Sequence, residues 1–291
     1  MKLGGIELGG TKIVCAIGNE DGVIEERMIV PTKQADETLD LVFDFFRNKK
    51  IDSLGIASFG PVDLNKESET YGFITTTPKP GWEKTDVLGR FVSLSVPLGF
   101  DTDVNAACLG EVVHGAARGC KNAVYGTIGT GIGFGIFVNG DLLHGLLHPE
   151  TGHMHIGKHE SDQTFFGPCP YHEDCLETLA SGLSIEKRWG KKAYDLYDVK
   201  EVWDLESYYL GKALCNCVLC YSPEKIILGG GMMHTPGLIE RVRTQTLKQL
   251  NGYIKAKKLL ECIDEYIVLP ELGDDAGVIG AMELGRMELF K

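Results

Sequence analysis

The sequence predicts an α/β protein of two domains, each built on a sheet that contains parallel strands. Residues 6–8 and 13–17 have strand patterns joined by a glycine turn, residues 36–49 carry apolar side chains at helical spacing, and residues 53–59 form a short apolar strand pattern. This strand, helix, strand order is typical of a parallel sheet. A second glycine hairpin at residues 124–138 lies about one domain further along, and its likeness to the first suggests a weak internal duplication.

Length and composition limit the class of protein. The chain has 291 residues, 43% of them hydrophobic, which is enough for one large or two ordinary domains with buried cores. The net charge of −12 argues against general nucleic-acid binding, which needs a basic surface. There is no apolar run long enough to predict a membrane span, and no apolar secretion signal. Nine cysteines, an odd number, favour a reducing compartment, so we expect a cytoplasmic protein.

Further elements are expected along the chain. A helix with a polar start is predicted over residues 103–117, and we place the domain boundary near residues 115–121. A buried strand at 225–228 runs into three glycines, and helices are expected at 238–251 and in the small-residue segment that ends near Met287. The expected domains are therefore residues 1–117 and 118–291.

Three glycine-rich turns follow strand patterns. They are Gly9-Gly10-Thr11-Lys12, Gly129-Thr130-Gly131 and Gly229-Gly230-Gly231. Glycine lets the main chain approach a phosphate closely with its N–H groups directed inward, and Thr11, Lys12 and Thr130 could add side-chain donors. Any one such turn is more often only a hairpin or a helix start. The chemistry that all three share favours phosphate binding.

Two aspartates lie at the start of the helix expected from residue 103. Residues 101–107 read Asp-Thr-Asp-Val-Asn-Ala-Ala. A carboxylate at a helix N-terminus stays ionised because the helix dipole favours negative charge, and it can accept the proton of a hydroxyl group that attacks a phosphate. The commonest role of aspartate here is to cap the helix. Asp103 is therefore either a base or an ordinary cap.

Residues 150–177 carry a metal-ligand pattern. Cys169, His172 and Cys175 are separated by gaps of two residues, and with His153 they make a Cys2His2 set of the closed, structural zinc type. His155 is a rival for the fourth ligand, because alternate residues of a strand share a face. Four protein ligands leave no open position for hydrolysis. If zinc binds one nitrogen of His153, the other becomes a fixed donor.

Eight segments match motifs of one family, in order and over nearly the whole chain. They are Glu7-Leu-Gly-Gly-Thr-Lys12, Ala57-Ser-Phe-Gly-Pro-Val-Asp63, Thr77-Pro-Lys-Pro-Gly-Trp82, Thr102-Asp-Val-Asn-Ala-Ala107, Ile128-Gly-Thr-Gly-Ile-Gly133, Glu150-Thr-Gly-His153, the zinc segment and Leu228-Gly-Gly-Gly231. Together they resemble the ROK family of sugar kinases and repressors. The resemblance implies an actin-like (ribonuclease H-like) ATPase fold, with two α/β domains, a cleft between them, and a last helix that could pack back on the first domain.

The resemblance also implies roles for residues of the matching motifs. Asp103 looks like the catalytic base. The residues that look like substrate contacts are Gly60, Asn105, Glu150 and His153. The residues on the phosphate and adenosine sides are Gly10, Thr11, Lys12, Thr130, Gly131, Gly229, Gly230 and Gly231. The zinc ligands would be His153, Cys169, His172 and Cys175. The implied cofactors are ATP, Mg²⁺ and a structural Zn²⁺, and the family favours homodimers.

Two departures from the family pattern narrow the expectation. Glu7 stands where most of the family has aspartate, and the zinc segment reads Cys-x-x-His-x-x-Cys rather than a three-cysteine pattern. Both departures resemble the fructokinase branch, which implies ATP-dependent phosphorylation of a hexose at its 6-hydroxyl group, with fructose as acceptor. A kinase for glucose, mannose or an N-acetylhexosamine remains an alternative. A sugar-sensing regulator is disfavoured, because few residues precede the first strand and the chain is acidic.

Overall fold

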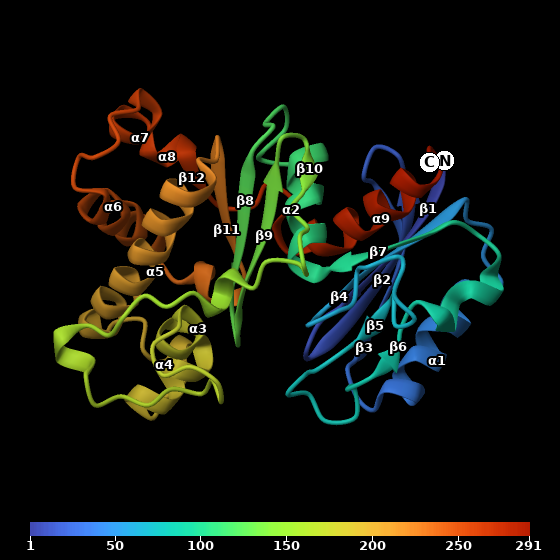
Figure 1. Ribbon diagram of the computed structural model, residues 1–291, viewed down its shortest axis with the longest axis horizontal. Helices are drawn as coiled ribbons and strands as arrows, with labels where there is room; N and C mark the ends of the chain where they lie inside the picture. The colour runs from blue at the N-terminus through green and yellow to red at the C-terminus, as the bar shows by residue number, and fades with distance from the viewer. The chain divides into compact units, whose positions relative to one another are not determined.

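The computed structural model describes residues 1–291, and helices and strands are present along the whole chain (Figure 1). The chain divides into two compact units. Unit 1 comprises residues 1–119, 142–149 and 271–291, and unit 2 comprises residues 120–141 and 150–270. None of the helices combines the length and the apolar character needed to cross a membrane.

The first five-stranded sheet belongs to unit 1 and has the strand order β3-β2-β1-β4-β7. Its strands are β1 (Lys2–Leu8), β2 (Lys12–Asn19), β3 (Ile24–Pro31), β4 (Ser53–Ser58) and β7 (Leu98–Thr102). Strands β1 and β2 form the predicted antiparallel hairpin, and β4 and β7 run parallel to β1. A small two-stranded sheet is made by β5 (Phe73–Ile74) and β6 (Thr85–Asp86).

The second five-stranded sheet has the order β10-β9-β8-β11-β12. Its strands are β8 (Ala123–Ile128), β9 (Ile132–Val138), β10 (Asp141–Leu142), β11 (Lys225–Gly229) and β12 (Ile267–Val268). Strands β8 and β9 form the second predicted hairpin, and β11 and β12 run parallel to β8. Both sheets therefore place an antiparallel hairpin beside two parallel strands, which agrees with an internal duplication.

Nine α-helices complete the fold. Unit 1 contains α1 (Ala35–Phe46), α2 (Asp103–Val113) and α9 (Ala276–Glu288). Unit 2 contains α3 (Leu176–Ala180), α4 (Gly182–Trp189), α5 (Lys200–Tyr221), α6 (Leu238–Leu250), α7 (Lys257–Glu261) and α8 (Ile263–Tyr266). Helix α2 ends four residues before the predicted position, because the side chain of Glu111 accepts the main-chain N–H of Ala116 and takes the chain out of the helical path.

The sheet of unit 1 is covered on both faces. Along β2, Ile13, Cys15 and Ile17 belong to the same core as helix α1, whereas Val14 and Ala16 pack with helix α9. Alternate residues of a strand point to opposite faces, so α1 and α9 lie on opposite sides of the sheet. This double covering explains why the middle of the parallel strand β4, residues 54–57, is entirely buried and has no polar side chain.

Helix α9 lies unusually close to its neighbours. A Cβ atom at Gly55 on β4 would lie 1.7 Å from the carbonyl oxygen of Ala281, and one at Gly280 would lie 1.7 Å from that of Ala106 on α2. Only glycine fits at such main-chain contacts. The small-residue composition of the last helix is therefore what allows it to pack against β4 and α2 together.

Candidate active site

The β1–β2 turn of unit 1 is open to solvent at its tip. Gly10, Thr11 and Lys12 are exposed, and a Cβ atom at Gly10 would meet nothing within 4 Å. The turn is closed by a 3.0 Å hydrogen bond from the N–H of Gly9 to the carbonyl of Lys12. Lys79 donates to the carbonyl of Gly10 from outside. A ligand phosphate could therefore reach the main chain of residues 10–12, as a phosphate-holding turn requires.

The first turn of α2 carries the candidate base. Thr102 is the N-cap, and its Oγ1 accepts the N–H of Asn105 at 3.1 Å. Asp103 is thus the first helical residue rather than the cap, and its Oδ1 accepts the N–H of Val104 at 2.9 Å. The helix is capped without Asp103, so the carboxylate of Asp103 can serve chemistry.

Two carboxyl groups in unit 1 have strongly raised pKa values. Burial raises the pKa of Asp103 from 3.8 to about 6, although the N–H of Val104 opposes part of this shift. The pKa of Glu7 on β1 rises to about 7, first through burial and then through the charge of Asp103, while Lys12 acts in the opposite direction. Carboxyl groups perturbed in this way are typical of functional sites.

The β8–β9 turn of unit 2 is tied to helix α3. The N–H of Gly129 donates to the carbonyl of Gly131 at 3.0 Å, which closes the turn around Thr130. Glu177 Oε2, from the first turn of α3, accepts the N–H of Ile132 at 3.0 Å. A Cβ atom at Gly131 would lie 2.7 Å from the same oxygen. The path of this turn therefore depends on the carboxylate of Glu177.

The glycines after β11 form the third turn. Gly230 has φ of 89°, a conformation that favours glycine. A Cβ atom at Gly230 would also lie 2.5 Å from the carbonyl oxygen of Ile128, at the end of β8. The chain then continues as a short 3₁₀ helix from Gly231 to His234. Main-chain N–H groups at such a helix start can hold a phosphate or another polar group.

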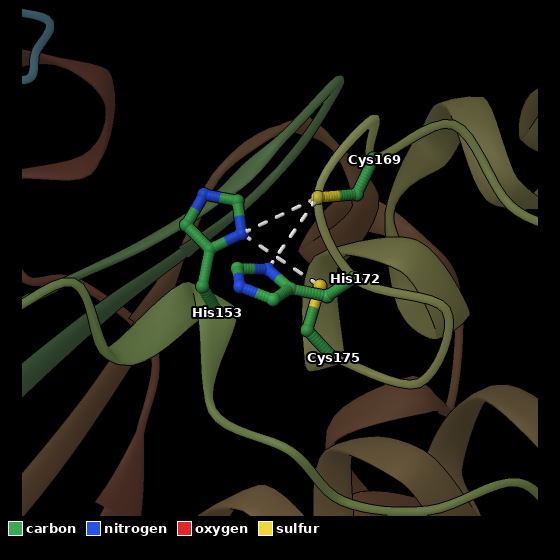
Figure 2. A group of neighbouring side chains, drawn as sticks. All are labelled: His153, Cys169, His172 and Cys175. Carbon is green, nitrogen blue, oxygen red and sulfur yellow. Dashed lines mark hydrogen bonds between the residues drawn. The ribbon is translucent and has the colours of Figure 1, made fainter.

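Four candidate metal ligands of unit 2 converge (Figure 2). Their ligand atoms all lie within 4.8 Å of one another, and the residues are His153, Cys169, His172 and Cys175. His153 Nδ1 lies 3.8 Å from Cys169 Sγ and 3.7 Å from Cys175 Sγ. Tetrahedral zinc with ordinary bond lengths would place sulfur and nitrogen about 3.6 Å apart. The donor set and its spacing therefore fit a zinc ion.

The rival fourth ligand, His155, has a different partner. Its Nδ1 lies 2.5 Å from Asp174 Oδ1, and it is not one of the four converging residues. The geometry therefore favours His153.

The chain is similar to known proteins over nearly its whole length. The ROK family profile matches residues 3–288. A Bacillus subtilis (strain 168) protein is 50% identical over 288 residues, covering 99% of this chain and 96% of that protein. The fructokinase of Pediococcus pentosaceus is 41% identical over 290 residues and covers 99% of both chains. The chain belongs to the ROK family.

A solved structure extends this result to the fold. The ROK hexokinase of Thermus thermophilus superposes with a TM-score of 0.82, at 24% identity, over 100% of this chain and 99% of that protein. At this identity the likeness concerns the fold alone. The predicted actin-like α/β fold is confirmed.

The segment Glu150-Thr-Gly-His153, which matched a family motif in the sequence, contains a short 3₁₀ helix. Thr151–His153 form this helix after Glu150, and the N–H of His153 donates to the carbonyl of Glu150 at 2.9 Å. With Nδ1 of His153 directed at the two thiols, Nε2 is the other ring nitrogen, and it lies 4.0 Å from Glu177 Oε1. The neighbour of Nε2 in unit 2 is therefore the carboxylate of Glu177, which the sequence analysis did not single out.

The predicted residues divide between the two units. Unit 1 contains Gly10, Thr11, Lys12, Gly60, Asp103 and Asn105. Unit 2 contains Thr130, Gly131, Glu150, His153, Cys169, His172, Cys175, Gly229, Gly230 and Gly231. Glycine turns are thus present in both units, whereas the candidate base and the candidate metal cluster belong to different ones.

Sequence reasoning missed four polar residues that support these groups. Glu177 holds the β8–β9 turn, and Asp101 accepts a 2.8 Å hydrogen bond from the side chain of Asn105. In unit 1, His144 contacts Asp101 on β7, and His148 accepts the N–H of Val62, which lies beyond the end of β4. Asp101 was noted in the sequence as one of two aspartates near the start of α2, without a role, and it lies in β7. Nothing local marks the partners of the two histidines.

Proposed function

We propose that this ROK family member is an ATP-dependent sugar kinase that phosphorylates the 6-hydroxyl group of a hexose, with fructose as the preferred acceptor. The observation that carries the proposal is Asp103, in the first turn of α2 beside Asn105, with a pKa of about 6. A carboxyl group with this pKa is ionised at neutral pH and still basic enough to accept a proton. The fructokinase name of the Pediococcus relative supports both the reaction and the acceptor.

The proposed reaction moves one phosphoryl group from ATP to the sugar and one proton from the sugar to the protein. A carboxylate oxygen of Asp103 takes the proton of the 6-hydroxyl group while the hydroxyl oxygen bonds to the γ-phosphorus of ATP. The bond from the γ-phosphorus to the β,γ-bridging oxygen breaks, and ADP leaves. Proton acceptance of this kind contributes ~10²–10⁴ in rate. Positioning and charge stabilisation supply the larger part of phosphoryl-transfer catalysis.

We propose candidates for sugar contacts within each unit separately. Gly60 and Asn105 are the candidates in unit 1, and Glu150 and His153 are those in unit 2. With Nδ1 of His153 directed at the cluster, Nε2 carries the proton and is a donor in a fixed position. This donor and the carboxylate of Glu177 could engage neighbouring sugar hydroxyl groups.

Nucleotide binding is assigned to the three glycine turns, residues 10–12, 130–131 and 229–231. Their main-chain N–H groups suit phosphate oxygens and need no basic surface. Mg²⁺, when bound with ATP, neutralises charge on the β- and γ-phosphates. Glu7 is the candidate carboxylate for it, directly or through water, because a nearby cation would favour the ionised form of a group whose pKa is otherwise about 7.

The cluster of His153, Cys169, His172 and Cys175 is proposed to hold a structural Zn²⁺. Zinc, when bound, joins the 3₁₀ turn at His153 to the loop that ends at α3. Two thiolates and two imidazoles saturate a tetrahedral ion, so the metal orders the loop rather than activating water. In this proposal the four-residue site holds the imidazole ring of His153 in one orientation, so that its other nitrogen can contact the sugar.

We further propose a cytoplasmic homodimer. All nine cysteines are free thiols, which suits a reducing compartment. The dimer rests on the family resemblance. Analytical ultracentrifugation at several protein concentrations tests it directly, and a single species of 31.9 kDa would contradict it.

A coupled assay of ADP release tests the function. We expect release with fructose, dependent on Mg²⁺, and much weaker release with glucose, mannose and N-acetylhexosamines. Asp103→Asn should lower kcat by ~10²–10⁴. Stronger activity on another hexose would correct the acceptor and keep the kinase, whereas no release with any hexose would refute the kinase proposal.

A further inference from the structure

Residues Leu142–Pro149, here named the strap, belong to unit 1 and are held by two histidines at the ends of neighbouring strands. His144 Nε2 lies 2.8 Å from Asp101 Oδ2 on β7. His148 Nε2 accepts the N–H of Val62, beyond the end of β4, at 3.2 Å. Strands β4 and β7 are parallel neighbours. The strap therefore lies at their carboxyl ends, where α/β proteins place their ligands.

Asp101 joins the strap to helix α2. Its side chain is buried, and a carboxylate can only accept, so His144 donates from Nε2. The other oxygen, Oδ1, accepts the N–H of Thr102 at 2.7 Å and Nδ2 of Asn105 at 2.8 Å. Both oxygens of Asp101 are thus engaged, and one of the three donors comes from the strap.

The amide of Asn105 depends on this arrangement. An asparagine amide can rotate about its last bond unless one end is held. Asp101 holds Nδ2, so it determines where the amide oxygen of Asn105 is directed, two residues from Asp103. The orientation of the Asp101 carboxylate is in turn fixed by Thr102 on one side and His144 on the other.

We propose that His144 is a positioning residue for sugar phosphorylation: by holding Asp101, it fixes the amide of Asn105 beside the base Asp103. This inference rests on the proposed function, in which Asn105 contacts the sugar. A purely structural role for His144 predicts something different. Its side chain is 41% exposed, so losing the imidazole leaves little cavity and should hardly change the sugar kinetics.

Two variants of His144 separate these roles. His144→Phe keeps a ring but has no donor, and His144→Gln keeps an N–H donor at a similar reach. Leu146→Ala is the matched control, because Leu146 lies in the same strap and is 98% exposed. We expect His144→Phe to lower kcat/KM for the sugar by about ten- to a hundredfold with the KM for ATP unchanged. His144→Gln should restore most of this loss, and Leu146→Ala should match the wild type.

A double-mutant cycle tests the route through Asn105. If His144 acts through Asn105, adding His144→Phe to Asn105→Ala should cause little further loss of kcat/KM. Losses that multiply would overturn the proposal, because they would show independent actions. Equal kinetics of His144→Phe and wild type would overturn it as well.

The kinetic measurements use whichever hexose the wild type phosphorylates best, and a wild type that phosphorylates none refutes the proposed function.

Hydrogen exchange gives a second readout, which does not depend on turnover. The side-chain amide hydrogens of Asn105, observed by NMR, then test the positioning role alone. We expect slow exchange in wild type and His144→Gln and faster exchange in His144→Phe. Identical exchange in all three would overturn the inference.

Discussion

Gly277, at the start of helix α9, lies directly against the carboxyl group of Glu7. A Cβ atom at position 277 would approach Cδ and Oε1 of Glu7 to 2.4 Å. Glu7 is one methylene longer than the aspartate found in most of the ROK family, and the missing side chain at position 277 provides the room that it needs. The location of this carboxyl group thus depends on a residue 270 positions away in the chain.

Gly277→Ala should displace Glu7 and impair its proposed role toward Mg²⁺. We expect a higher Mg²⁺ concentration for half-maximal activity and a loss of kcat of about tenfold or more. Glu7→Asp provides a matched rescue, because the shorter side chain leaves space for a methyl group. The double variant should therefore be more active than Gly277→Ala alone. Wild-type magnesium dependence in Gly277→Ala would contradict this view of Glu7.

The raised pKa of Asp103 predicts an acid limb in the pH–rate profile. The base must be ionised, so kcat/KM for the sugar should be constant at neutral pH and fall about tenfold per pH unit below about 6. Because Glu7 and Asp103 interact, the observed value belongs to the pair. A flat profile down to pH 5 would exclude this base.

The effect of Asp103 on folding stability should vary with pH in the opposite direction to its effect on activity. A carboxyl group whose folded pKa is raised disfavours the folded state once it ionises, so its contribution worsens as pH rises from about 4 to 6. Asp103→Asn should therefore be as stable as the wild type, or more so, at pH 8 while it loses activity. Thermal unfolding of both proteins at pH 5 and 8 measures this, and a variant that is less stable at pH 8 would contradict it.

Loss of one thiol should remove the metal. Cys169→Ser is the sharper variant, because Cys175 also caps helix α3 by accepting the N–H of Thr178. We expect about one zinc per chain in the wild type, less than about half in the variant, and a lower unfolding temperature. Cys220→Ser, at an exposed cysteine of α5, is the control. Equal zinc content in wild type and Cys169→Ser would refute the four-ligand site.

His148 should make stability depend on pH. Burial lowers its pKa below the usual 6.5, and the neutral ring accepts the N–H of Val62. Its contribution is therefore present above pH 6.5 and lost as pH falls through the lower, folded pKa, by at most about 1.4 kcal/mol per pH unit. His148→Gln can keep an acceptor without titrating, so its unfolding free energy should vary less between pH 5 and 7. Parallel curves for the two proteins would contradict this.

Local patterns were sufficient for the two hairpins, for several helices and for three of the four residues of the metal cluster. The apolar spacing of residues 36–49 and the two glycine hairpins predicted α1, β1–β2 and β8–β9, because helix and hairpin formation depend on near neighbours in the chain. The gaps between Cys169, His172 and Cys175 place three ligands in one short loop. The end of α2 was missed, because a side chain of that helix, Glu111, captures the next main-chain N–H.

The sequence by itself determined the two-domain α/β class, the glycine turns and three of the four converging residues, since each depends on residues close together in the chain. Asp103 was singled out as a base only by the family resemblance. Only the tertiary structure placed His153 rather than His155 among the converging side chains, paired Asp101 with His144, and set Gly277 against Glu7. These pairings join residues far apart in sequence. They depend on strand register and on the approach of one helix to a sheet, which packing of the whole unit determines.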